Sequence, residues 1–153
     1  MNDELDEIDN SDGGSMLNTR TLLWNVEDLE NPVHVGSHIA DVEAIDHNLY
    51  VRGNRAYLAN YCSGLRILDS TQVRENHTST LEKKPIMKFN AIPFQMNVGL
   101  APEMAYFDAA DYCEGAIFGG VWSVYPFFDS GNVIMSSIEL GLFILRPDYE
   151  QIN

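Results

Sequence analysis

The chain has 153 residues, of which 45% are hydrophobic, so it is long enough to form one domain with a hydrophobic core. Its 23 acidic and 9 basic residues give a formal net charge of −14. This charge argues against nucleic acid or an anionic membrane as partner, because both bind cationic surfaces, whereas a basic protein or a divalent cation would suit it. We also expect no membrane insertion and no signal peptide in this chain, since Met1 is followed by acidic residues.

Residues 1–19 form the most acidic segment. Six acidic residues and no basic residue lie among the first twelve, which predicts a solvated, disordered tail. Residues 9–13 (DNSDG) resemble part of a calcium-binding loop. When Gly13 takes the place of that loop's invariant glycine, however, Ile8 and Thr19 stand where acidic ligands are required. Calcium is therefore a candidate cofactor with an incomplete set of ligands.

From Thr21 onward, short runs of β-branched and aromatic residues alternate with Gly, Asn, Asp and Pro, which is typical of strands and turns. The pattern predicts an all-β fold. Gly53-Asn54 and Gly131-Asn132 indicate two-residue hairpin turns, since both residue types accept positive φ angles. The polar segment 70–103 interrupts the rhythm and predicts an insertion. The expected strands cover residues 21–26, 33–38, 47–52, 56–61, 65–69, 86–89, 104–108, 121–127, 133–136 and 142–145.

Two stretches of the chain, which begin 78 residues apart, repeat each other: Gly53-Asn54 and Gly131-Asn132 each open a strand, and a second strand begins at Gly64-Leu65 or at Gly141-Leu142. Such an echo favours a repeat architecture in which one unit stacks on another. Short strands with this repeat predict a β-propeller, and the chain holds about two to three blades of the usual length. We therefore expect a partial propeller over residues 20–148, a C-terminal tail over residues 149–153, and self-association through open blade edges.

The repeated strings also resemble a known family. Residues 46–54 (DHNLYVRGN), 59–61 and 63–69 (SGLRILD), and later 120–128 (GVWSVYPFF), 130–134 and 141–147 (GLFILRP), resemble the LVIVD-repeat β-propeller proteins called the choice-of-anchor B family. Residues 22–28 and 31–36 look like a variant of the family's strand-ending phrase. The resemblance implies the C-terminal blades of a secreted or cell-surface propeller, attached to cells by variable anchors and without a settled catalytic activity.

Asp46, His47 and Asn48 form the most polar group in the repeated region. They are candidate ligand-binding residues near a propeller axis, although one His and one Asp do not complete a metal site. The alternative is that Asp46 and Asn48 satisfy backbone groups of a loop while His47 hydrogen-bonds a neighbouring blade. Trp122 and Tyr125 belong to an aromatic stretch that either stacks on a sugar or peptide, or packs between blades.

Cys62 and Cys113 are the two cysteines, and the sequence leaves open whether they pair. Asn76 begins an N-glycosylation sequon. Ser63 or Cys62 with His47 and Asp46 would be needed for nucleophilic catalysis, but no known catalytic motif is present.

The preferred hypothesis is a non-enzymatic propeller segment that binds or adheres to a protein or carbohydrate ligand. The alternatives are a hydrolase or metal-dependent enzyme that uses the Asp46-His47 region, and a truncated fragment with no independent role.

Overall fold

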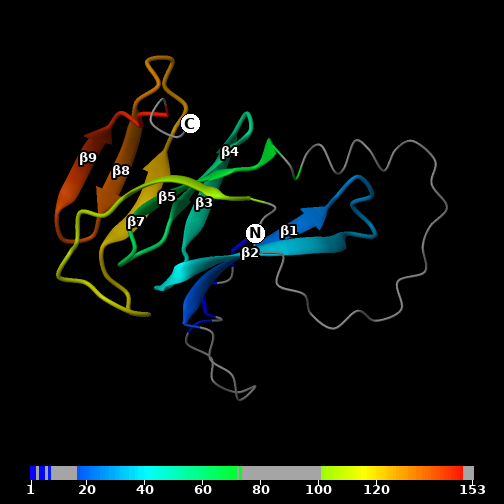
Figure 1. The fold of residues 1–153 in the computed structure, drawn as a ribbon, viewed down its shortest axis with the longest axis horizontal. Helices are drawn as coiled ribbons and strands as arrows, with labels where there is room; N and C mark the ends of the chain where they lie inside the picture. The colour runs from blue at the N-terminus through cyan, green and yellow to red at the C-terminus, as the bar shows by residue number, and fades with distance from the viewer. Residues whose placement is uncertain (3, 6, 8–16, 72, 74–100, 150–153) are drawn as a thin grey trace.

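The computed structural model describes residues 1–2, 4–5, 7, 17–71, 73 and 101–149. These residues form an all-β protein with three small antiparallel sheets (Figure 1). The first sheet is a hairpin of β1 and β2, the second is a meander in the order β3-β4-β5-β6, and the third has the order β7-β8-β9. The strands are β1 (Asn18–Asn25), β2 (Val33–Glu43), β3 (Asn48–Arg52), β4 (Arg55–Ala59), β5 (Leu65–Asp69), β6 (Glu103–Phe107), β7 (Val121–Tyr125), β8 (Val133–Ser137) and β9 (Gly141–Leu145).

Nine of the ten predicted strands overlap a strand of the structure, and the tenth, residues 86–89, lies outside the described residues. The first predicted turn is also confirmed. Arg52 pairs with Arg55 across β3 and β4, so Gly53 and Asn54 alone form the turn, and Gly53 has a φ of 60°. Residues 70, 71, 73 and 101–103 of the predicted insertion are described. All but Glu103, the first residue of β6, belong to the connection between β5 and β6, which are neighbours in one sheet.

The second predicted two-residue turn, Gly131-Asn132, is wrong. β7 ends at Tyr125 and β8 begins at Val133, so the connection covers residues 126–132. Pro126 has no N–H group to donate to the ladder, which ends β7 earlier than the pattern predicted. Within this longer loop, the Gly131 N–H donates to the Phe128 carbonyl over 3.0 Å and forms a turn.

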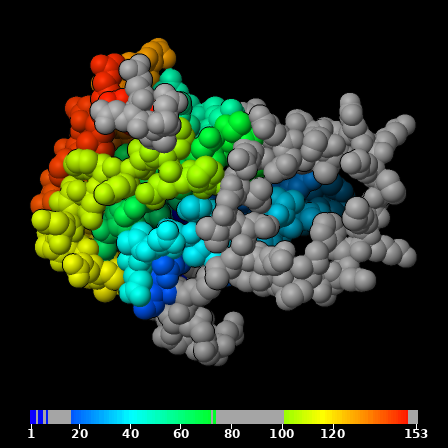
Figure 2. Space-filling view, viewed as in Figure 1, coloured from blue at the N-terminus to red at the C-terminus, as the bar shows by residue number. Residues whose placement is uncertain are grey.

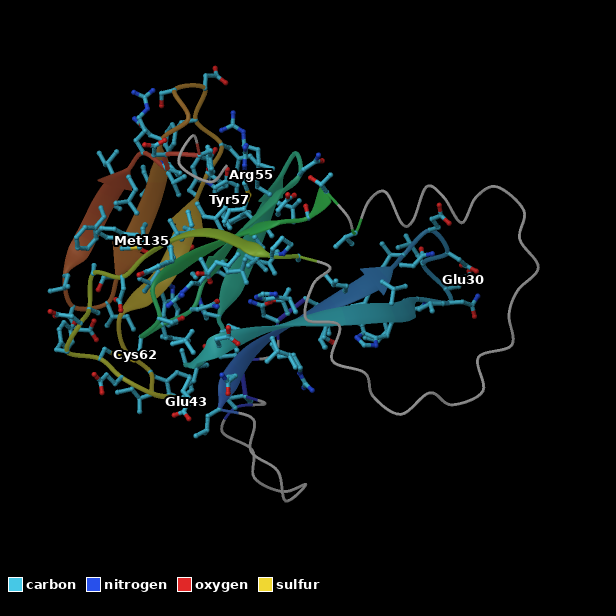
Figure 3. All side chains as sticks on the ribbon, in the orientation of Figure 1. Glu30, Glu43, Arg55, Tyr57, Cys62 and Met135 are labelled. Carbon is cyan, nitrogen blue, oxygen red and sulfur yellow. A yellow bond between two sulfur atoms is a disulfide. The ribbon has the colours of Figure 1, made fainter. Side chains whose placement is uncertain are left out.

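The main core lies between the second and third sheets. Figure 3 labels Tyr57 and Met135, one from each side of this core. The other face of the second sheet is also buried, and packs with Ala101. The main core contains Tyr57, Ala59, Leu65 and Ile67 from the second sheet and Val121, Val124, Val133 and Met135 from the third; the other face of the second sheet contributes Ala56, Leu58 and Leu68.

The second and third sheets repeat each other row by row. Tyr50, Tyr57 and Ile67 form a cross-strand row in the second sheet, and Tyr125, Ile134 and Ile144 form the equivalent row in the third. The first row faces the third sheet, with Tyr57 and Ile67 in the core. The equivalent row points away from the second sheet, because its residues alternate with the buried Val133 and Met135. The two sheets are therefore stacked head to tail rather than as mirror images.

Described residues near both ends of the chain contact the sheets. The sequence predicts a disordered tail over residues 1–19, whereas Met1 exchanges hydrogen bonds with the backbone of Leu22, and Asn2 forms a bridge with Thr21. These contacts pair part of the edge of β1, which a two-stranded sheet would otherwise leave open. At the other end, Tyr149 belongs to the predicted C-terminal tail, yet its hydroxyl lies 3.0 Å from that of Tyr57.

Residues 101–120 form much of the surface on the face drawn in Figure 2. They include β6 and the irregular stretch that leads to β7. Within the described part of the chain, no helix is long and apolar enough to cross a membrane.

Candidate functional site

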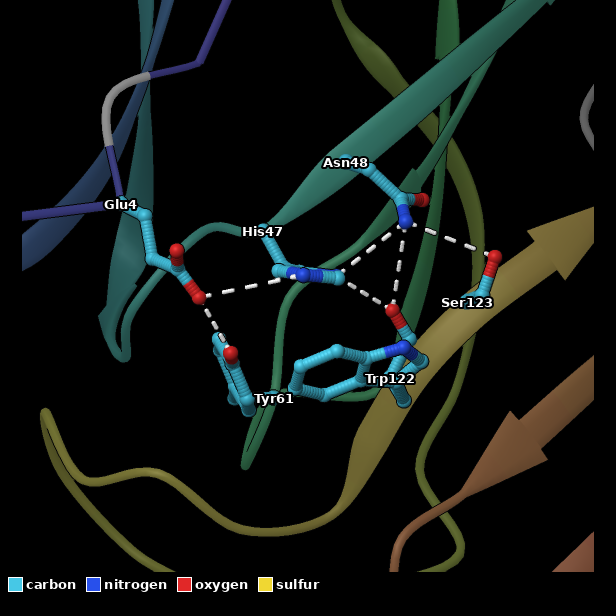
Figure 4. Close-up of polar contacts among 6 residues, drawn as sticks. All are labelled: Glu4, His47, Asn48, Tyr61, Trp122 and Ser123. Atoms are coloured by element: carbon cyan, nitrogen blue, oxygen red, sulfur yellow. Dashed lines mark hydrogen bonds and ion pairs between the residues drawn. The ribbon is translucent and has the colours of Figure 1, made fainter.

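His47 and Asn48, two of the three residues in the predicted polar group, lie where the second sheet meets the third (Figure 4). His47 precedes β3, and its imidazole packs against the ring of Trp122 on β7, with the ring centroids 4.3 Å apart. His47 Nδ1 also makes a short hydrogen bond to the Trp122 carbonyl. Because a carbonyl can only accept, Nδ1 carries the hydrogen of this bond.

The side-chain amide of Asn48 joins the same contact. Its nitrogen donates to the Trp122 carbonyl and to the Ser123 hydroxyl, each over 3.4 Å, and lies 3.1 Å from His47 Nδ1. Three of the five predicted ligand-binding residues, His47, Asn48 and Trp122, are therefore in one group. Their hydrogen bonds link the two sheets.

Tyr61 and Glu4 complete this group, and sequence reasoning missed both. The Tyr61 hydroxyl donates a short hydrogen bond to Glu4 Oε1, which lies 3.8 Å from His47 Nε2. The Tyr61 residue is only 1% exposed, and burial raises the pKa of its phenol, with the hydrogen bond to Glu4 adding to the effect. Tyr61 was assigned to a strand and Glu4 to a tail, so no local pattern could bring them together.

Asp46 is directed away from its sequence neighbours in this group. Its carboxylate is fully buried, and Oδ2 accepts a hydrogen bond from the Arg20 backbone N–H over 3.0 Å. Burial lowers the pKa of the Met1 amino group, and the charge of Asp46 partly opposes that shift. Asp46 therefore serves the packing of β1 and of the N-terminal residues.

Tyr125 belongs to a different group, which we call the aromatic cluster and which consists of Tyr50, Tyr125, Phe127 and Phe128. The ring centroid of Tyr125 lies 6.5 Å from Tyr50, 5.4 Å from Phe127 and 5.1 Å from Phe128, all in edge-to-face arrangements. Arg52 holds the loop that carries the two Phe residues, because its guanidinium donates to the carbonyls of Pro126 and Phe128 over 2.6 and 2.9 Å. All four rings remain between 38% and 46% exposed.

The residues proposed for nucleophilic catalysis have other partners. Cys62 forms a disulfide with Cys113, with a distance of 5.0 Å between their Cα atoms. The Ser63 hydroxyl donates to the Asn60 carbonyl over 3.1 Å. Neither side chain is held by His47, so the geometry adds no support for a catalytic pair.

Among the residues that the structure describes, no group of three or more His, Cys, Asp or Glu side chains could hold a metal ion. The possible calcium loop at residues 9–13 and the sequon at Asn76 lie outside the described residues.

A groove of about 500 Å³ between β2 and the β5-β6 pair was not predicted from the sequence. Arg66 lies in it, donates to the Glu103 carboxylate over 3.2 Å, and stacks 4.7 Å from the centre of the Tyr106 ring. Burial lowers the pKa of His38, which lines the same groove, while the nearby charges of Glu103 and Asp41 oppose this shift. Arg66 and Glu103, two of the charged groups of the groove, are thus engaged with each other.

Comparisons of the chain with protein-family models, with curated proteins and with solved structures found no match. The resemblance to the choice-of-anchor B family therefore remains a prediction from the quoted strings.

Proposed function

We propose that this chain is a segment of a β-propeller from a secreted or cell-surface protein, and that it acts by binding a protein or carbohydrate ligand rather than by catalysis. One observation carries the proposal: three pairs of residues, each 75 positions apart, meet between β3 and β7. These pairs are His47 with Trp122, Asn48 with Ser123, and Tyr50 with Tyr125. Equivalent residues of successive blades approach one another in this way where inner strands surround a propeller axis.

The disulfide between Cys62 and Cys113 supports the proposed location. Disulfides form and persist in oxidising compartments, and they are rare where glutathione and thioredoxin keep thiols reduced. This bond links the turn after β4, in the second sheet, covalently to the stretch before β7, the first strand of the third sheet.

The aromatic cluster is the surface that we assign to ligand binding. Four partly exposed rings gather there, and aromatic rings offer a large contact area to a sugar face or to an apolar side chain. Since Arg52 anchors the loop of Phe127 and Phe128, the rings are held in place before a ligand arrives.

The test is to measure binding of the oxidised chain to immobilised oligosaccharides and to purified extracellular proteins. We expect Phe127→Ala to abolish binding to at least one of these surfaces. Trp24→Ala is the matched control, because Trp24 is a similarly exposed aromatic residue on the separate β1-β2 hairpin. Equal binding by the chain and its Phe127→Ala variant, or no binding to any surface, would count against the aromatic cluster as the ligand site.

A further inference from the structure

One face of the third sheet presents exposed apolar side chains. Ile144 is 69% exposed and Leu142 is 63% exposed. Ile134 lies between Tyr125 and Ile144 in the same cross-strand row. We call Ile134, Leu142 and Ile144 the outward face. Ser123, Ser136 and Leu142 make up the neighbouring row, so both rows lack charged side chains in a protein whose net charge is −14.

The equivalent face of the second sheet shows how such a surface is covered. Tyr57 corresponds to Ile134, Leu65 to Leu142 and Ile67 to Ile144, each 77 residues earlier in the chain. These three residues are 5%, 2% and 1% exposed, because the third sheet packs on them. Leu65 and Ile67 are therefore buried in the second sheet, whereas their equivalents Leu142 and Ile144 are exposed in the third.

The covering surface is an aliphatic face. In the third sheet, Val124, Val133 and Met135 lie on the second sheet and are buried. Their equivalents in the second sheet are Leu49, Ala56 and Leu58, which form the opposite, also apolar, face of that sheet. Each of the two sheets thus has one face equivalent to the outward face and one aliphatic face. In the observed contact, the aliphatic face of the third sheet packs on the other face of the second sheet.

We propose that the outward face docks the aliphatic face of a further antiparallel sheet of the same repeat, stacked head to tail as the third sheet is on the second. This inference rests on the proposed propeller arrangement and names the partner that the arrangement requires. A second copy of the chain is less suited to the role, because both of its aliphatic faces are already buried within the chain. The partner is therefore a sheet whose aliphatic face is free.

The experiment supplies such a sheet. A copy of residues 120–149 is joined after Asn153 through a flexible linker, and oxidation of side chains by hydroxyl radicals is measured by mass spectrometry. We expect oxidation of Leu142 and Ile144 in the original chain to fall severalfold when the added unit is present. The matched control carries Val124→Glu and Met135→Glu in the added copy alone, and it should leave both residues as reactive as in the 153-residue chain.

Each other outcome overturns a distinct statement. Unchanged oxidation of Leu142 and Ile144, with Tyr57 and Ile67 still protected, would overturn this inference and leave the stack of two units intact. Protection that appears in the unextended chain as its concentration rises, with a doubled mass by light scattering, would make a second copy the occupant and would also overturn it. Oxidation of Tyr57 and Ile67 would refute the head-to-tail stack itself, and with it the proposed function.

Discussion

The side-chain amide of Asn48 donates a hydrogen bond of 3.4 Å to the hydroxyl of Ser123, and the two residues hold equivalent positions in the second and third sheets. The cross-strand partners of Asn48 and Ser123 are Ala59 and Ser136, which are equivalent as well. A polar contact between equivalent positions fixes the register of one unit against the other, whereas an apolar contact would tolerate sliding. The pair is therefore a direct probe of how the units are joined.

We predict that Asn48→Ala lowers the free energy of unfolding by about 1–2 kcal/mol, because its amide donates to both the Trp122 carbonyl and Ser123. In a double-mutant cycle measured by urea unfolding, Asn48→Ala and Ser123→Ala should show a coupling of about 0.5 kcal/mol or more. Asn31→Ala is the control, since the Asn31 amide bonds only within an exposed turn, to Asp28. Additive effects of the two substitutions would contradict a direct contact between the units.

The strands and one turn could be predicted because their signals are local. Alternating apolar residues and the Gly53-Asn54 pair each act within a few positions, and the structure confirms both. The turn at Gly131-Asn132 failed because Pro126, several residues earlier, ends the preceding strand. A local signal for a turn does not reveal where the pairing on either side of it stops.

The candidate site was only partly accessible to sequence reasoning. His47, Asn48 and Trp122 could be selected for their chemistry, and one alternative had His47 hydrogen-bonding a neighbouring blade, but nothing in the sequence identified Trp122 as its partner. Glu4 reaches Tyr61 only because the N-terminal residues pair with β1, and that is a tertiary contact. Residue type thus pointed to candidates, while their grouping depended on how the sheets pack.

We predict that Gly120→Ala is strongly destabilising. Gly120 has a φ of 82°, and a Cβ atom there would lie 2.6 Å from the Tyr61 carbonyl oxygen. Gly131→Ala is the matched control, since Gly131 has a φ of 78° but open space around the same position. The control should cost about 1–2 kcal/mol for the left-handed backbone alone, and Gly120→Ala should cost clearly more. Equal shifts of the two variants in thermal unfolding would mean that β7 does not approach Tyr61 so closely.

Reduction of the disulfide between Cys62 and Cys113 should lower stability. The bond closes a loop with a sequence separation of 51, for which the chain-entropy model gives about 4 kcal/mol. The measurement compares urea unfolding of the chain with and without dithiothreitol. A Cys62→Ala/Cys113→Ala variant should match the reduced chain and should not respond to the reductant. A reductant effect that persists in this variant would show that the loss has another origin.

Tyr61 predicts a loss of stability at alkaline pH. Its pKa in the folded protein is raised, first by burial and then by the hydrogen bond to Glu4, while in the unfolded chain it is about 10. The folded state therefore holds the phenol proton more tightly. This contribution to stability is complete below pH 10 and declines at higher pH, as the unfolded chain ionises. Tyr149 adds in the same direction, since burial and its contact with Tyr57 raise its pKa as well.

Tyr61→Phe separates the contribution of Tyr61 from that of Tyr149, because phenylalanine cannot titrate. We expect the variant to be less stable than the parent chain near neutral pH, and to lose less stability between about pH 9 and about pH 11. Urea unfolding midpoints measured across this range for the parent chain and for Tyr61→Phe give both slopes. If Tyr61→Phe and the parent chain declined in parallel, the Tyr61 phenol would have to be open to solvent, and the group around His47 would not be closed as described.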